Sequence, residues 1–78
     1  MTLTELRYLV ALAESGHFRK AAEQCSVSQP TLSIAIKKLE AELGVCLFER
    51  ARHKVAATPT GELIVEQART VLRETQNL

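Results

Sequence analysis

Residues 25–44 of this 78-residue chain, CSVSQPTLSIAIKKLEAELG, carry the strongest structural signal in the sequence. Ser28 has the form of a helix N-cap, and the Gln-Pro pair after it would occupy the first turn, where a missing backbone donor is harmless. Inward apolar residues then recur at helical spacings of four, three and four: Leu32, Ile36, Leu39 and Leu43. Gly44 follows as a helix stop. The pattern predicts a helix over residues 29–43.

Two shorter helices precede this segment. Residues 3–15 place apolar side chains on one helical stripe: Leu3, Leu6, Leu9, Val10, Leu12 and Ala13. Thr2 and Glu5 have the spacing of a capping box at its start, and Gly16 is the expected stop. A second helix fits residues 18–25, with these side chains inward: Phe18, Ala21, Ala22 and Cys25. Two helices joined by tight turns to an N-capped third predict a helix-turn-helix.

A short hairpin and one long helix are expected after the third helix. The next residues read as an apolar run, a polar basic tip over 49–54 and a second apolar run, which suggests a small wing. Thr58 then caps a helix that begins at Pro59 and continues to Leu78. About 20 helical residues span roughly 30 Å, more than a body this small can cover. We therefore expect dimerisation with a second copy of the chain through Leu63, Ile64, Ala68, Val71 and Leu72.

The sequence thus predicts a mainly α fold. Residues 1–58 form a winged helix-turn-helix of three helices plus a small β-hairpin wing, and residues 59–78 form a long linker and dimerisation helix. An exposed helix N-terminus attracts phosphate, and Gln, Thr and Ser side chains can approach base edges in the major groove without bulk. The common use of such a fold is reading DNA. Winged helices also serve as protein interaction or oligomerisation modules without nucleic acid, and the pattern leaves this alternative open.

Composition narrows the classes of function. With 46% hydrophobic and 24% charged residues the chain is expected to fold as one domain, but its formal charge of +1 misses the strongly basic signature of many nucleic-acid binders. Between residues 19 and 54, however, seven Lys and Arg residues stand against four Glu residues, so the charge is polarised. No apolar run approaches the roughly 20 residues of a membrane span. Because the chain has no Asp, no glycine-rich phosphate loop and no close Cys or His pair, we expect neither an enzyme nor a bound metal or cofactor.

The segment FRKAAEQCSVSQPTLSIAIKKLEAELGVCLFER (18–50), followed by TPTGE (58–62), closely resembles the LysR-type transcriptional regulators of bacteria. Residues 1–33 and the closing QARTVLRET (67–75) look most like the peroxide-sensing OxyR branch of that family. The resemblance implies a homodimer formed by the linker helix, a tetramer in the full-length protein, and an effector-binding domain that this chain lacks. It also implies a cytoplasmic, nucleoid-associated regulator of transcription that acts in the oxidative stress response.

The resemblance further implies how double-stranded DNA binds. It places the 29–43 helix in the major groove of an inverted-repeat site, and the wing, about residues 49–55, on the minor groove or phosphates. It assigns to DNA the cap, the polar residues after it and two lysines nearer to phosphates: Ser28, Gln29, Pro30, Thr31 and Ser33, then Lys37 and Lys38. Apart from the resemblance, the local concentration of positive charge predicts contacts with phosphates or the minor groove by a second set of residues: Arg19, Lys20, Arg50, Arg52, His53 and Lys54. Many family members carry an arginine where this chain has Ile34, so part of their base-reading set is missing here.

Overall fold

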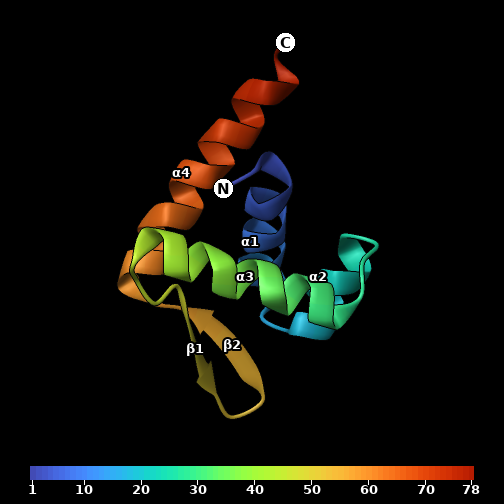
Figure 1. Ribbon diagram of the computed structural model, residues 1–78, viewed down its shortest axis with the longest axis vertical. Helices are drawn as coiled ribbons and strands as arrows, with labels where there is room; N and C mark the ends of the chain where they lie inside the picture. The colour runs from blue at the N-terminus through green and yellow to red at the C-terminus, as the bar shows by residue number, and fades with distance from the viewer.

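The computed structural model describes residues 1–78 as four helices and one antiparallel hairpin. In chain order the elements are α1 (Leu3–Ser15), α2 (Phe18–Gln24), α3 (Gln29–Leu43), β1 (Phe48–Ala51), β2 (Lys54–Ala57) and α4 (Pro59–Gln76). Helices α1, α2 and α3 pack together, the hairpin projects from one end of the molecule, and the C-terminal half of α4 projects from the other (Figure 1). The predicted winged helix-turn-helix followed by a long helix is confirmed.

The three predicted N-caps are present. Thr2, Ser28 and Thr58 each have extended backbone, and each side-chain oxygen accepts a hydrogen bond from the amide three residues further on. Glu5 completes the predicted capping box by accepting from the Thr2 amide. Removal of such a cap typically costs about 1 kcal/mol. The helix starts are therefore set by side chains that the local sequence already identifies.

The core lies where α1 and α3 meet the base of the hairpin and the first half of α4. Its fully buried large side chains are Leu9, Leu12, Leu32, Leu39 and Leu47. Burial of each such side chain contributes roughly 1.5–3 kcal/mol, so these five residues hold the helices together. The apolar stripe predicted that Leu3 faces inward, but Leu3 is exposed. The first buried residues of α1 are Glu5 and Leu6.

The start of α4 is fixed against the residues that precede the hairpin. Thr58 is buried; its amide donates to the Leu47 carbonyl at 3.0 Å, and its hydroxyl donates to the Cys46 carbonyl at 2.7 Å. Gly61 packs so closely that a Cβ atom there would lie 2.1 Å from the Leu47 carbonyl oxygen. Only glycine fits this contact, and it fixes the direction in which α4 leaves the domain.

Some element ends differ from the sequence-based expectation. Helix α2 ends at Gln24 with Cys25 as its C-cap, and α4 ends at Gln76 rather than at residue 78. The largest difference is in the wing. Strand β1 continues to Ala51, which pairs with Lys54 of β2. The expected tip over 49–54 was therefore too long. Most side chains of the two strands are exposed, so the wing lacks the alternating apolar pattern by which strands are usually identified.

No helix has both the length and the apolar character needed to cross a bilayer. No group of three or more His, Cys, Asp or Glu residues gathers in a way that could hold a metal ion. Cys25 and Cys46 are both free thiols, and burial raises the pKa of the Cys25 thiol.

Candidate nucleic-acid interface

The start of α3 is exposed and polar. The buried side of this helix carries Leu32, Ala35, Ile36 and Leu39, which turns the opposite side to solvent. Ser28, Gln29, Pro30, Thr31 and Lys37 are all exposed, and Ser33 is half-buried. The Ser28 hydroxyl donates to the Thr31 hydroxyl oxygen at 2.8 Å, which leaves the Thr31 proton free to donate elsewhere. This face therefore offers amide and hydroxyl groups at a helix N-terminus, the arrangement that suits an anionic, hydrogen-bonding ligand.

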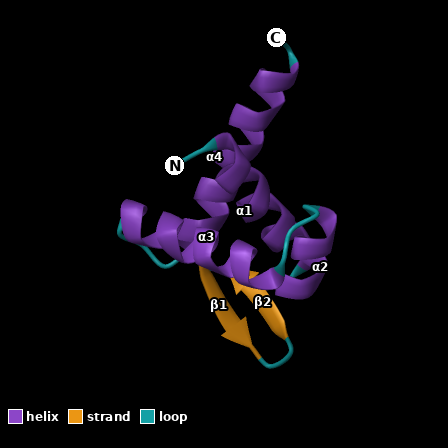
Figure 2. Ribbon diagram, turned by 45° about the vertical axis from the view of Figure 1, so that its right-hand side comes forward, coloured by secondary structure: helices purple, strands orange, loops and turns teal.

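A groove of about 420 Å³ runs between the start of α2, the start of α3 and the wing. Its polar lining brings together six of the residues predicted to contact DNA with one further lysine: Arg19, Lys20, Gln29, Arg50, Arg52 and His53, with Lys54. No carboxylate lines it. Figure 2 shows the hairpin projecting beside α2 on the side of the molecule away from the C-terminal end of α4. Segments separated by thirty residues in sequence thus build one cationic surface, which we call the wing groove.

Arg50 joins the wing groove to the outer face of α3. A second, smaller hollow places its side chain with Ser33 and Lys37 of α3. The Arg50 guanidinium lies over the ring of Phe18, 5.0 Å from the ring centroid. Such a cation–π contact contributes about 0.5–1 kcal/mol at an exposed site and limits where the charge can move. Sequence reasoning assigned Phe18 to the core alone and missed this second role.

Glu40 sets the position of the wing relative to α3. Its Oε2 atom accepts hydrogen bonds from the amides of Leu47, at 2.8 Å, and Phe48, at 3.4 Å. Glu40 is charged and lies outside the apolar stripe of α3, yet it is half-buried. The contact spans seven residues of sequence and has no local motif, so the sequence alone carries no signal for it.

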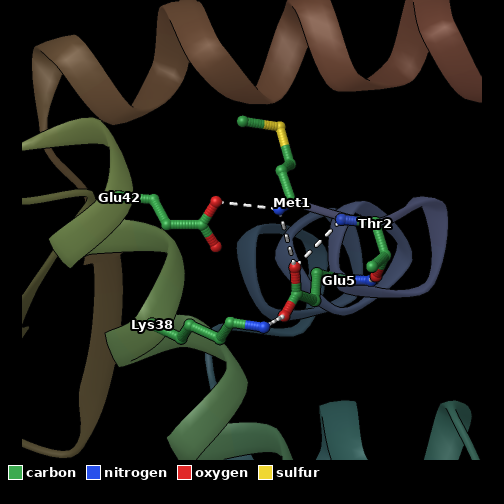
Figure 3. A network of polar contacts seen from close by, with 5 residues as sticks. All are labelled: Met1, Thr2, Glu5, Lys38 and Glu42. Atoms are coloured by element: carbon green, nitrogen blue, oxygen red, sulfur yellow. Dashed lines mark hydrogen bonds and ion pairs between the residues drawn. The ribbon is translucent and has the colours of Figure 1, made fainter.

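Lys38 is directed away from the wing groove. Its Nζ atom lies 3.4 Å from Glu5 Oε2 on α1, and the Met1 amino group lies 2.8 Å from Glu42 Oε2 (Figure 3). Burial of the Glu5 carboxyl opposes its ionisation, but the Thr2 amide and Lys38 together hold the pKa of Glu5 below its ordinary value. Lys37, the preceding residue, makes no ion pair and lies on the wing side with Arg50. The two lysines predicted to lie near phosphates therefore have different surroundings.

The residues predicted for dimerisation separate into three groups. Leu63 and Val71 are 71% and 42% exposed and remain open to a partner. Ile64 and Leu72 are partly buried against the core. Ala68 is buried within the chain, because it shares with Val65 the side of α4 that packs on the domain. The expectation that Ala68 meets a second copy is corrected accordingly.

The sequence matches a known family over most of its length. Residues 3–62 fit the family described as bacterial regulatory helix-turn-helix protein, lysR family. The chain belongs to the LysR family. This LysR-family chain is 63% identical, over all 78 residues, to a hydrogen peroxide-inducible genes activator of Pectobacterium carotovorum subsp. carotovorum. It spans 26% of the length of that relative.

Solved structures agree in both family and fold. A full-length OxyR variant from Pseudomonas aeruginosa is 61% identical with a TM-score of 0.93, over 99% of this chain and 26% of the other. The CbnR DBD–DNA complex is 36% identical with a TM-score of 0.94, over 99% of this chain and 88% of the other. The family is one of transcriptional regulators, and its architecture is the winged helix-turn-helix described above.

Proposed function

We propose that this chain binds double-stranded DNA sequence-specifically and thereby regulates transcription in bacteria. The observation that carries the proposal is the junction of two features: the capped, polar start of α3 and a cationic groove that no carboxylate lines. Anionic backbone and hydrogen-bonding base edges occur together in the grooves of a duplex, so the two features have complementary partners in one ligand. The similarity to the CbnR DBD–DNA complex supports the same ligand class.

The geometry suggests a division of labour within the interface. Gln29 and Ser33, short and polar on α3, suit base edges in the major groove. Arg19, Lys20 and Arg52, around the wing groove, suit phosphates or the adjacent minor groove. The first group would discriminate between sequences, and the second would contribute affinity for any duplex.

A homodimer is the second part of the proposal. Leu63 and Val71 lie on the open side of α4, and apolar residues on a projecting helix are stabilised when a second copy covers them. A two-fold dimer reads an inverted repeat, with half-sites about 10 base pairs or a multiple apart so that both α3 helices enter grooves on one face. In the full-length protein we expect two such dimers to form a tetramer.

The biological setting is also proposed from the relatives. The names of the similar proteins point to hydrogen peroxide-inducible genes, and this chain covers about a quarter of their length. We propose that the chain is the DNA-binding part of a regulator of the oxidative stress response that acts in the cytoplasm on the nucleoid. In this role the chain carries out no catalytic step and uses no cofactor.

Selection of bound sequences from a random duplex pool tests the function. The proposal predicts enrichment of one inverted repeat, and binding to it that weakens steeply as salt increases. A protein interaction module, the alternative that the sequence left open, predicts no enriched sequence. Absence of enrichment, or affinity indifferent to both sequence and salt, would contradict the proposal.

A further inference from the structure

Ile34 is an exposed apolar side chain on a helix that otherwise buries its apolar residues. It is 68% exposed and is the one large hydrophobic residue left exposed between Leu3 and Leu63. Single exposed apolar residues are common on protein surfaces, so exposure alone carries no meaning. The position of Ile34 relative to the wing groove is what gives its exposure significance.

Helix geometry places Ile34 at the outermost part of α3. Successive residues advance by about 100°, so Ile34 lies opposite the buried stripe of Leu32 and Leu39. Pro30, one turn before, and Ala41, two turns after, are exposed on the same strip, and both are short. The long side chains nearest to Ile34 are Lys37 and Lys38, one turn later, and Lys38 is paired with Glu5 on α1. Lys37 is flexible and carries a charge suited to a phosphate, so it need not cover Ile34. A duplex that enters against α3 and the wing groove would therefore meet Ile34 near the floor of its major groove.

The chemistry of base edges then limits what Ile34 can face. The major-groove edges present hydrogen-bond donors and acceptors, and thymine alone adds a methyl group. An isoleucine pressed on a donor or acceptor leaves that group without a partner, whereas against a methyl it excludes water from two apolar surfaces. Its β-branch also fixes the first side-chain torsion, which gives the contact a defined shape.

We infer that Ile34 is a specificity-determining residue that selects thymine at one position of each half-site by contact with the C5 methyl group. The inference rests on the proposed function and deepens it. It adds an apolar reading element to an interface whose other proposed contacts, Pro30 apart, are polar or charged. The cationic wing groove beside the helix argues for a duplex, rather than another protein, as what covers this side chain.

Replacement of thymine by uracil removes only the methyl group, so it isolates the contact. The 78-residue chain and its Ile34→Ala and Ile34→Val variants are titrated with the duplex recovered from the random pool, in which each thymine of one half-site is changed to uracil in turn. At one position we expect the unmodified chain to bind the uracil duplex about fourfold more weakly, the effect of losing one buried methyl. Ile34→Ala is expected to bind both duplexes equally there, and Ile34→Val to keep most of the difference.

Controls separate this result from damage to the fold. Ile34 is outside the core, so Ile34→Ala is expected to unfold at the same temperature as the unmodified chain. Leu3→Ala, which shortens another exposed aliphatic side chain, 42% exposed on α1, is expected to keep the uracil effect unchanged.

Two results would overturn the inference while the proposed function stands. One is a uracil effect that persists in Ile34→Ala; the other is a selected half-site in which no thymine shows a methyl effect. If the pool yields no preferred sequence at all, the proposed function itself fails, and the inference falls with it.

Discussion

Positive charge is used differently at the two ends of the molecule. At the wing end, defined here by Arg19, Lys20, Lys37, Arg50, Arg52 and Lys54, no side chain takes part in an ion pair. At the scaffold end, the Met1 amino group, Lys38 and Arg69 make all five ion pairs of the structure with Glu5, Glu14, Glu42 and Glu66. A formal charge of +1 therefore says little about binding. The location of the unpaired charges is what identifies an anionic ligand.

The largest expected loss of stability comes from substitution of Gly61. Gly61→Ala places a Cβ atom 2.1 Å from the Leu47 carbonyl oxygen, so backbone must shift. We expect a loss of about 3 kcal/mol in the free energy of unfolding, measured in urea. Gly44→Ala is the matched control: its Cβ meets nothing within 4 Å, and only the left-handed backbone, with φ of 70°, costs about 1–2 kcal/mol. Equal losses for both variants would contradict the close contact.

At the wing end, Gln29 is expected to affect binding without affecting stability. Gln29→Ala removes an exposed amide from the first turn of α3, where it lines the wing groove. We expect a loss of about 1–3 kcal/mol in binding of the selected duplex, with preference relaxed at one base pair and unfolding unchanged. Gln24→Ala, at the end of α2 and outside the groove, is the control. A similar loss from both changes would remove Gln29 from base reading.

Arg50 tests whether the wing acts on any sequence alike. Arg50→Ala removes a cation held over Phe18, and we expect affinity for specific and scrambled duplexes to fall by about 1 kcal/mol each, with the salt slope flattened by about one unit. Phe18→Leu keeps the charge but removes the ring, so it should weaken binding less and leave the slope in place. Loss confined to the specific duplex would instead make Arg50 a base-reading residue.

Lys37 and Lys38 provide a comparison within one turn of helix. Lys37→Met is expected to flatten the salt slope by about 0.9, the effect of one lost phosphate contact. Lys38→Met is expected to leave the slope nearly unchanged and to lower stability by less than about 1 kcal/mol, because its partner is Glu5. Equal slope changes would restore Lys38 to the set of phosphate contacts predicted from the sequence.

The smallest expected effect is a pH dependence at Glu5. Folding lowers the pKa of Glu5 from its ordinary value of 4.5. The ionised carboxylate therefore adds stability above pH 4.5, and that stability is lost as pH falls through the ordinary pKa and then through the folded pKa. The difference in unfolding free energy between the unmodified chain and Glu5→Gln should therefore shrink from pH 7 toward pH 3. A difference that stays constant over this range would exclude the ion pair as its source.

Local signals in the sequence were enough to predict the helices. Ser28 precedes the Gln29-Pro30 pair, Thr58 precedes Pro59, and Thr2 precedes Glu5 at capping-box spacing. The starts of α1, α3 and α4 follow directly from these caps. The positions of Arg50 and Arg52 in the wing were also predicted, because the basic run lies between two apolar runs. These features depend on neighbours only a few residues away.

Features that depend on distant neighbours were not predicted. Glu40 bonds to the start of the hairpin, Phe18 lies beneath Arg50, and Gly61 presses on Leu47, yet none of these contacts has a periodic pattern. Ala68 was misassigned because an apolar stripe on α4 does not say which part packs on its own domain. Long-range packing decides these cases, and it becomes visible only when the elements are assembled.

Salt dependence tests the central claim most directly, namely that DNA binds the unpaired charges of the wing end. Two triple variants remove equal charge. One changes Lys37, Arg50 and Arg52 to Gln at the wing end. The other changes Lys38 and Arg69 to Gln at the scaffold end, together with Arg73, which lies in the last turn of α4 and makes no ion pair. The affinity of each for the selected duplex is measured across salt concentrations. We expect the first variant to flatten the slope of log affinity against log salt by about 2.7 for each protomer, and the second to leave it unchanged. Equal flattening by both variants, or flattening by the second alone, would contradict the account.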